Sequence, residues 1–227
     1  MSWGITGLWP LSMQANRPNI ASASFSGSRK GHPVVMIEIG GLIPFTTIDY
    51  PGKLAAVLFC RGCPWRCGYC HNRHLIPATG GESVSWPEVI ALLRRRSGLL
   101  DAVVFSGGEP TMQAGLCDAI RTVRGMGFKV GLHTAGSFPE MLMECLPELD
   151  WVGMDIKAPF DEYEAITGVP DSGEVARKSV ELLRMSGIPH QFRTTLDPFL
   201  QSAGRFEAMR RTVSKWGDEL TVQQMIP

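Results

Sequence analysis

The sequence predicts an α/β domain built on a parallel sheet. From residue 55 onward, short apolar runs of strand length alternate with stretches whose apolar residues recur at helical spacing. This alternation is typical of βαβ units, in which a helix returns the chain to the start of the next parallel strand. It fits an open doubly wound sheet or a partial barrel, and periodicity does not decide between them. No Gly-x-Gly-x-x-Gly loop follows a strand, which weakens the dinucleotide-binding form of the open sheet.

Each expected strand is a short run rich in aliphatic, aromatic or β-branched residues. Strands are expected at residues 55–60, 102–106, 128–134, 151–157, 190–196 and 220–225. Helices are expected after Ser85, over residues 112–123, around 138–146, over 175–183 and over 203–215. Ser85 and Glu88 give the first helix a capping-box spacing before an apolar run. Gly125 and Gly127 end the second helix, and Gly187 follows the fourth.

Residues 1–35 carry several Ser, Gly and Pro residues and no sustained periodicity. This composition predicts a disordered leader. Met36 opens the segment MIEIGGLIPFTTIDYPGKL, which has the character of a domain start. We therefore expect a folded domain over residues 36–227, and Met36 is a second candidate for the start of translation.

Length and composition are those of an ordinary soluble protein. The 227 residues fit one sizeable domain, and Lys plus Arg equals Asp plus Glu at 22 each. A zero net charge gives no basic excess of the kind that nucleic-acid binding requires. No apolar run reaches the roughly 18 residues of a membrane span, and the first 35 residues lack the apolar core of a signal peptide. We predict a cytoplasmic protein that binds neither nucleic acid nor membrane.

Polar residues cluster where the expected strands end. In parallel α/β folds, binding sites are built at the carboxyl ends of the strands, so one pocket can collect these groups. The groups are the cysteine segment from Cys63, Gly107 to Glu109, His133 with Thr134, Asp155 with Lys157, and Arg193.

Four of the six cysteines lie within FCRGCPWRCGYCHN, residues 59–72. The bunched cysteines do not form the spread framework of a secreted disulfide protein, so we expect reduced thiols. Cys117 and Cys145 fall in helical segments, where we expect small buried hydrophobic side chains. Zinc is a serious competitor for the bunched cysteines, although its Cys-x-x-Cys pairs are normally parted by a longer loop. Bacterial ferredoxin spacing does not match either.

The spacing Cys63-x3-Cys67-x2-Cys70, with Tyr69 before the last cysteine, resembles the C-x3-C-x-φ-C signature of the radical S-adenosylmethionine (SAM) superfamily. The resemblance implies that these three thiolates hold a [4Fe-4S] cluster whose fourth iron is left for SAM. An electron from the cluster then cleaves SAM to a 5′-deoxyadenosyl radical. Thiolates are the ligands that such clusters take. Cys60 lies three residues too early for this triad, and we expect it to pack or to support the loop.

The segment SGGEP, residues 106–110, is similar to the superfamily's GGE motif, which contacts the amino group of SAM. With GGLIPFTTIDYPGKL, MDIKAP and FRTTL, the chain looks like an anaerobic ribonucleoside-triphosphate reductase activating protein over residues 36–226. These proteins belong to the glycyl radical enzyme activases. The resemblance implies a partial (β/α)6 TIM-like barrel and abstraction of hydrogen from one glycine of a partner enzyme. A flavodoxin or ferredoxin is the implied electron donor.

The resemblance also assigns the other site residues. Ser106, Gly107, Gly108 and Glu109 would bind the methionine part of SAM, and Tyr69 would lie near the adenine. The positions that surround SAM in this family are Thr134, Asp155, Lys157 and Arg193.

Some assignments stay open at this stage. Asp155 and Lys157 could instead form an internal ion pair. His133 departs from the family, which often has Asp here near the ligand or a cation, so a cation site is doubtful. His71 and Asn72 follow the cluster motif, and we expect His71 to support the cluster without ligating it.

Three functions compete on the sequence alone. The leading one is an activase for a glycyl radical enzyme, with ribonucleotide reductase as the nearest resemblance and pyruvate formate-lyase-like partners also possible. A second is a radical SAM enzyme for a small molecule, such as a deazapurine synthase. The third is a zinc-binding interaction module without catalysis. The absence of a second cysteine cluster favours a protein substrate.

Overall fold

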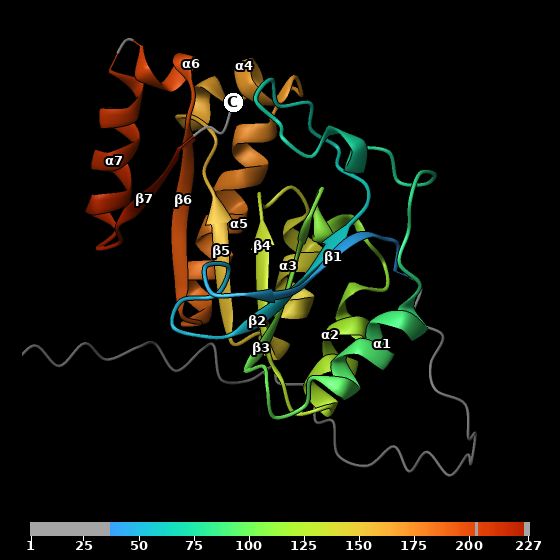
Figure 1. The fold of residues 1–227 in the computed structure, drawn as a ribbon. Helices are drawn as coiled ribbons and strands as arrows, with labels where there is room; N and C mark the ends of the chain where they lie inside the picture. The colour runs from blue at the N-terminus through green and yellow to red at the C-terminus, as the bar shows by residue number, and fades with distance from the viewer. Residues whose placement is uncertain (1–36, 203, 225–227) are drawn as a thin grey trace, which may run out of the picture. The chain divides into compact units, whose positions relative to one another are not determined.

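The computed structural model describes residues 37–202 and 204–224. The expected leader, residues 1–35, lies outside this part of the chain, as does Met36. Seven strands form one sheet in the order β1 to β7 (Figure 1). The strands are β1 (Ile39–Thr46), β2 (Ala55–Cys60), β3 (Ala102–Gly107), β4 (Lys129–Thr134), β5 (Trp151–Asp155), β6 (His190–Leu196) and β7 (Leu220–Gln224). Strands β2 to β7 run parallel, and β1 pairs antiparallel with β2.

Helices connect the strands in every interval that the sequence predicted. The α-helices are α1 (Trp86–Arg95), α2 (Leu116–Gly125), α3 (Pro139–Cys145), α4 (Tyr163–Thr167), α5 (Ser172–Ser186), α6 (Pro198–Gln201) and α7 (Arg205–Lys215). Short 3-10 turns are η2 (Arg73–Leu75), η3 (Pro110–Met112), η4 (Leu146–Glu148) and η5 (Phe160–Glu162). The capping box of α1 is confirmed, because the Ser85 backbone N–H donates to Glu88 at 2.9 Å. Within the described residues, no helix is both long and apolar enough to cross a membrane.

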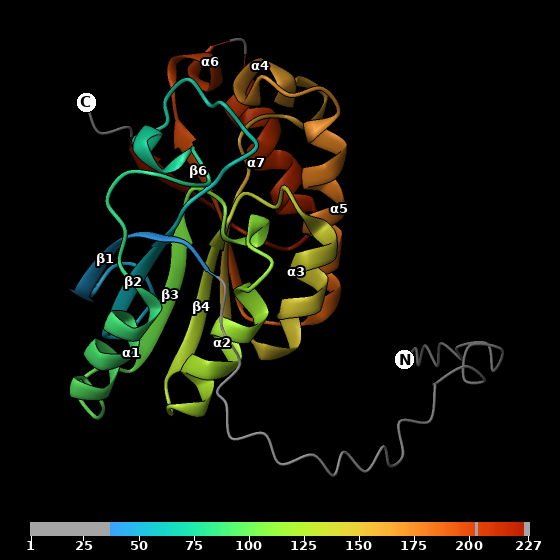
Figure 2. The same ribbon diagram turned by 90° about the vertical axis from the view of Figure 1, so that its right-hand side faces the viewer.

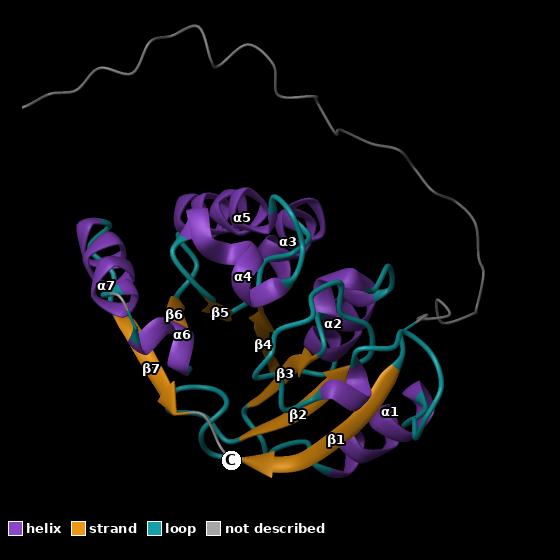
Figure 3. Ribbon diagram, turned by 90° about the horizontal axis from the view of Figure 1, so that it is seen from above, coloured by secondary structure: helices purple, strands orange, loops and turns teal. Residues whose placement is uncertain are grey.

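The strand order decides between the two architectures that periodicity left open. A doubly wound sheet reverses its strand order at a switch point and carries helices on both faces. Here each strand pairs with its neighbour in sequence, and the longer helices α2, α3, α5 and α7 lie outside a curved sheet (Figure 3). The described parts of the edge strands β1 and β7 do not pair with each other. The fold is therefore a partial TIM-like (β/α)6 barrel with an added antiparallel strand.

The antiparallel strand β1 was not predicted. Its sequence, IGGLIPFT, contains two glycines and a proline, and much of it is exposed. Glycine and proline are depleted in strands, and proline is tolerated on an edge because the missing N–H faces no partner. The pairing with β2 also has two register shifts, which break simple alternation. Tertiary pairing with β2 therefore forms a strand that local propensity does not indicate.

The amino-terminal end of the barrel is filled by side chains. Tyr50, from the loop between β1 and β2, packs on Trp151 with ring centroids 5.2 Å apart. Both belong to a buried cluster with the first residues of β2 and β3, Ala55 and Ala102. The Tyr50 ring packs against Gly131 so closely that a Cβ at this position would lie 3.0 Å from the ring. Since this end is packed, the carboxyl ends of the strands are left to form the site.

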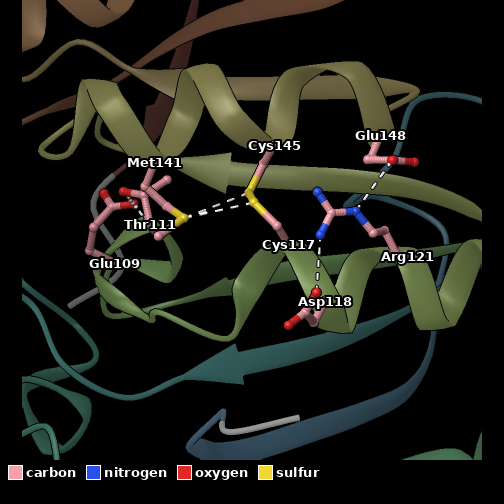
Figure 4. Close-up of a disulfide and its surroundings, with 8 residues drawn as sticks. All are labelled: Glu109, Thr111, Cys117, Asp118, Arg121, Met141, Cys145 and Glu148. Atoms are coloured by element: carbon pink, nitrogen blue, oxygen red, sulfur yellow. Dashed lines mark hydrogen bonds and ion pairs between the residues drawn. A yellow bond between two sulfur atoms is a disulfide. The ribbon is translucent and has the colours of Figure 1, made fainter. Parts of the chain in front are cut away.

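Cys117 of α2 and Cys145 of α3 form a disulfide, with their Cα atoms 5.2 Å apart (Figure 4). The expectation of reduced thiols was wrong for this pair, and so was the expectation of two separate hydrophobic side chains. Both residues are buried, as helical spacing predicted. Spacing within each helix cannot tell, however, that the two helices pack with these two positions facing each other. The other four cysteines are free thiols.

We expect the disulfide to be detectable by counting thiols. Alkylation of the unfolded, cluster-free protein should label four cysteines without reductant and six with it. The bond closes a loop with a sequence separation of 28, so reducing it should lower the free energy of unfolding by about 3–4 kcal/mol on the chain-entropy model. The double variant Cys117→Ala/Cys145→Ala should lose this dependence on reductant. Six labelled cysteines without reductant would contradict the disulfide.

Candidate active site

A cavity of about 290 Å³ opens at the carboxyl ends of the parallel strands. Of the twelve site residues predicted from the sequence, eleven line it: Cys63, Cys67, Tyr69, Cys70, Ser106, Gly107, Gly108, Thr134, Asp155, Lys157 and Arg193. The twelfth, Glu109, is fully buried and does not line the cavity. The structure therefore brings together residues from the cysteine loop and from the ends of β3, β4, β5 and β6.

The cysteine loop follows β2 and lies near α4 and α6 (Figures 1 and 2). Backbone hydrogen bonds fix its start, because the Gly62 and Cys63 N–H groups donate to the Leu75 and Ile76 carbonyls at 2.8 and 3.1 Å. Three of its thiols, those that line the cavity, are half-buried, whereas Cys60 is fully buried at the end of β2. Burial raises the pKa of the Cys63 thiol to about 11. Binding a metal at such thiols would therefore release protons.

The two glycines after Ser106 allow the chain to approach the end of β2 and the start of the cysteine loop at close range. A Cβ on Gly107 would lie 2.4 Å from the backbone N and O of Cys60, and the φ of Gly107 is +118°. A Cβ on Gly108 would lie 2.4 Å from the Gly62 carbonyl oxygen. The Gly108 and Glu109 N–H groups donate to the Cys60 and Gly62 carbonyls at 2.9 and 2.7 Å. The two glycines thus hold the start of the cysteine loop in place. From the residue type alone, we expected only that they let the backbone approach a ligand closely.

Glu109 organises the turn that follows β4. Its Oε1 accepts hydrogen bonds from the Thr111 N–H at 3.1 Å, the Thr111 hydroxyl at 2.6 Å and the Thr134 hydroxyl at 2.7 Å. The Ala135 N–H donates to Oε2 at 2.8 Å. Burial raises the pKa of this carboxyl group, and the four donors oppose that rise. The carboxylate therefore positions Thr134 and Ala135 at the cavity wall, and a direct contact with SAM stays a prediction.

Asp155, Lys157 and Arg193 form an ion-pair network on the cavity wall. The Asp155 carboxylate accepts from Arg193 Nε at 2.9 Å and from Lys157 Nζ at 3.1 Å. Burial alone would raise the pKa of Asp155, but the two cations hold it well below its usual range. Lys157 Nζ also lies 5.7 Å from the centroid of the Tyr69 ring. The ion pair expected as an alternative is confirmed, and its members still face the cavity.

His133 is a neutral member of the cavity wall. Its Nε2–H donates to the Asp49 carbonyl at 2.8 Å, and Nδ1 lies 3.4 Å from the Ser106 hydroxyl. Burial, followed by the charge of Arg193, lowers the pKa of His133 to about 4. The histidine thus links the loop before β2 to the ends of β3 and β4, and its ring carries no charge near neutral pH.

The lowered pKa of His133 predicts a loss of stability in mild acid. The unfolded histidine takes up a proton near pH 6.5 and the folded one only near pH 4. Stability is therefore unaffected by His133 above pH 6.5 and falls as the pH drops toward 4, because the unfolded state binds the proton first. By pH 5 the loss should reach about 2 kcal/mol. Urea unfolding of cluster-free protein at pH 7.5 and 5 should show this extra loss of stability in the wild type and not in His133→Gln. An equal loss of unfolding free energy between the two pH values in both proteins would contradict this prediction.

Sequence reasoning missed several cavity residues. Asp49 and Trp65 line the cavity from loops, and Thr195 and Gln223 line it from β6 and β7. Period-two alternation could have found Thr195, since it lies two residues beyond Arg193 on the same face of its strand. Asp49 belongs to the loop that packs into the barrel, and nothing in its local sequence signals that position.

The residues present fit the cofactors that the sequence resemblance implies. Three free thiols on one loop open to one cavity, which is the donor set of an iron–sulfur cluster. Within residues 37–202 and 204–224, no three His, Cys, Asp or Glu side chains are arranged around a single metal ion. The cavity wall offers both cations and backbone groups, which suit the zwitterionic amino-acid part of SAM. The Tyr69 hydroxyl is buried there with no hydrogen-bond partner among the described residues.

Comparisons with known proteins agree with this chemistry. Residues 57–201 match the family described as the radical SAM superfamily. The chain is 31% identical over 199 residues to a Methanocaldococcus jannaschii protein named as a glycyl-radical enzyme activating enzyme, covering 83% of this chain and 80% of the relative. It is 33% identical over 141 residues to the pyruvate formate-lyase-activating enzyme of Clostridium pasteurianum, covering 60% and 59%.

The solved structure of anSMEcpe with bound AdoMet is similar to this chain with a TM-score of 0.56 and 15% identity. The match covers 73% of this chain and 49% of that one. The structure of TYW1 with a lysine-pyruvate adduct has a TM-score of 0.54 and 15% identity, covering 75% and 65%. At this identity the two similarities show a shared fold.

Proposed function

Because the chain belongs to the radical SAM superfamily, we propose that it is an activating enzyme that generates a radical on a glycine of a partner glycyl radical enzyme. Its cofactors are those of the superfamily, a [4Fe-4S] cluster and SAM. The observation that supports the proposal most directly is the meeting of three free thiols, the Gly107–Gly108 turn and the Asp155 network in one cavity. The superfamily match leaves the zinc-binding module without support.

In this proposal Cys63, Cys67 and Cys70 hold the cluster. When bound, the cluster and SAM supply a one-electron cleavage of SAM that yields a hydrogen-abstracting radical. The protein itself binds the cluster and SAM, orients them and excludes water from the cavity.

The other residues of the cavity bind SAM. The Ser106–Gly108 backbone and Thr134 take its amino-acid part, where Glu109 fixes Thr134 through the 2.7 Å hydrogen bond. Lys157 and Arg193 offer cations to its carboxylate or ribose, and Asp155 holds both in place. Tyr69 and the buried Trp65 cover the side of the cavity next to the cysteines, Tyr69 near the adenine.

The partner is proposed to be an anaerobic ribonucleoside-triphosphate reductase. The segment GGLIPFTTIDYPGKL and the motifs SGGEPT, MDIKAP and FRTTL support this choice, since they resemble activases of that reductase. Pyruvate formate-lyase is the second candidate. It is favoured by the similarity to activating enzymes named for that lyase in Clostridium pasteurianum and in Escherichia coli, the latter 32% identical over 132 residues.

A small-molecule substrate is the competing proposal. The chain is 29% identical over 116 residues to the 7-carboxy-7-deazaguanine synthase of Thermococcus kodakarensis, and the match covers 42% of this chain. This coverage is half of the 83% of the chain that the glycyl-radical enzyme activating relative matches. The protein-substrate proposal therefore has the wider support.

An electron paramagnetic resonance assay tests the proposal. Cluster-loaded protein reduced with dithionite is mixed anaerobically with SAM and with each candidate partner enzyme. The expected result is a glycyl radical doublet with one partner and none with that partner's Gly→Ala variant. Formation of 5′-deoxyadenosine with a deazapurine precursor, and no doublet with any glycyl radical enzyme, would overturn it in favour of the small-molecule reading.

A further inference from the structure

We propose that a basic rim on the cysteine loop, formed by Arg66, His71, Arg73 and His74, is the docking surface for an acidic one-electron carrier protein. This inference rests on the proposed function, because only a cluster that must be reduced requires an electron donor. All four rim residues are exposed. They belong to the same segment as the three thiols that line the cavity.

The charge of this segment differs from that of the whole chain. From Cys60 to Gly81 there are three arginines and two histidines, and no Asp or Glu. In the whole chain Lys plus Arg equals Asp plus Glu at 22 each, with five histidines besides. Arg61 is buried, so the fixed positive charge that this stretch places at the surface beside the cluster ligands is that of Arg66 and Arg73. Such a patch steers an acidic protein toward the cluster.

Hydrogen bonds fix the two guanidinium groups over the loop. Arg66 Nη1 donates to the carbonyls of Cys63 and Trp65 at 2.8 and 2.9 Å. Arg73 Nη2 donates to the Gly68 carbonyl at 2.5 Å. A carbonyl orients a guanidinium group without cancelling its charge, so the two charges stay close to the cysteines.

Neither guanidinium group has an acidic partner within the described residues. Arg121, Arg184 and Arg205, by contrast, each pair with a carboxylate. Arg66 and Arg73 also keep their remaining N–H groups without protein acceptors in the described part of the chain. These N–H groups match the carboxylates of an acidic partner, which arginine binds in forked pairs. Two arginines are too few for the phosphate track of a nucleic acid, which the neutral chain also does not favour.

The half-buried thiols complete the argument. Cys63, Cys67 and Cys70 are neither exposed nor closed off. Arg66 lies between Cys63 and Cys67 in the chain, and the other three rim residues follow directly after Cys70. A carrier that docks on the rim therefore brings its redox centre close to the proposed cluster. One electron then passes from the reduced carrier to the oxidised cluster, with no bond made or broken in that step.

Stopped-flow reduction of the cluster-loaded protein tests the rim. The variant is Arg66→Gln/Arg73→Gln, and the matched control is Arg95→Gln/Arg211→Gln, two exposed arginines on α1 and α7. With a reduced, acidic flavodoxin as donor, we expect the rim variant to lose at least about tenfold in second-order rate constant at low salt. The control should keep the wild-type rate, and high salt should remove the difference. The variant Arg66→Lys/Arg73→Lys should recover most of the rate, because it restores the charge.

Dithionite separates docking from damage to the loop. Rates are expressed per loaded cluster, and dithionite should reduce the rim variant as fast as the wild type. An equal loss with dithionite and flavodoxin, or no difference between rim variant and control, would overturn the inference. So would a lysine variant as slow as the glutamine variant. The glycyl radical assay uses dithionite and needs no carrier protein. If the docking inference is wrong, that assay still gives the glycyl radical doublet. If the proposed function is wrong, the doublet is absent.

Discussion

Replacing Cys67 with alanine is expected to abolish cluster binding and SAM cleavage, whereas replacing Cys60 leaves both in place. Cys67 lines the cavity beside Cys63 and Cys70, and three thiolates are the fewest that hold a cluster with one iron left for SAM. Cys60 is fully buried at the end of β2 and does not line the cavity. Iron and sulfide analysis after anaerobic reconstitution, followed by assay of 5′-deoxyadenosine, measures both properties.

The Cys60→Ala variant is the matched control for this prediction. It removes a small buried side chain and should cost roughly 1 kcal/mol of stability, which urea unfolding of the cluster-free protein will show. Its iron content should stay at the wild-type value, while that of Cys67→Ala falls to background. Equal loss of iron in the two variants would show that the assignment of the ligands is wrong. One zinc ion per chain in the wild type, with no iron, would contradict the cluster itself.

The order of strands and helices could be predicted because each parallel strand is a buried apolar run between turn-forming residues. All six parallel strands lie where the sequence placed them, to within two residues. Strand β1 and the Tyr50 loop could not be predicted, because their conformation depends on β2 and on Trp151. The Cys117–Cys145 bond likewise depends on how α2 packs against α3.

The site was predicted more completely than the fold around it, for a physical reason. Parallel strands end at one edge, so chemistry-bearing residues at strand ends meet in space whatever the details of packing. Eleven of the twelve predicted residues accordingly line one cavity. The spacing of a motif in the sequence gives no information about which hydrogen-bond partners its side chains find in the folded protein. Glu109 is therefore at the predicted position, yet its oxygens are taken by Thr111, Thr134 and Ala135.

The glycines at the end of β3 are expected to be as sensitive as the cysteines. In Gly107→Ala, the added Cβ would meet the backbone of Cys60 at 2.4 Å and would also need a φ of +118°. Backbone atoms cannot move aside as a flexible side chain can, so the end of β3 must separate from the end of β2, where the cysteine loop begins. Strain of this kind costs about 1–3 kcal/mol, and overpacking adds a similar amount. We expect a clear fall in urea stability and a failure to retain the cluster.

Gly108→Ala and Gly125→Ala distinguish seating of the loop from a general intolerance of alanine. Gly108 has no positive φ, and the nearest atoms to its added Cβ would be those of the Gly62 carbonyl and the Leu75 carbonyl oxygen. This variant should therefore lose cluster retention with a smaller loss of stability than Gly107→Ala. At the end of α2, a Cβ on Gly125 meets nothing within 4 Å, and alanine there should be neutral or stabilising by up to about 1 kcal/mol. A Gly107→Ala protein with wild-type iron content would show that β3 does not seat the cysteine loop.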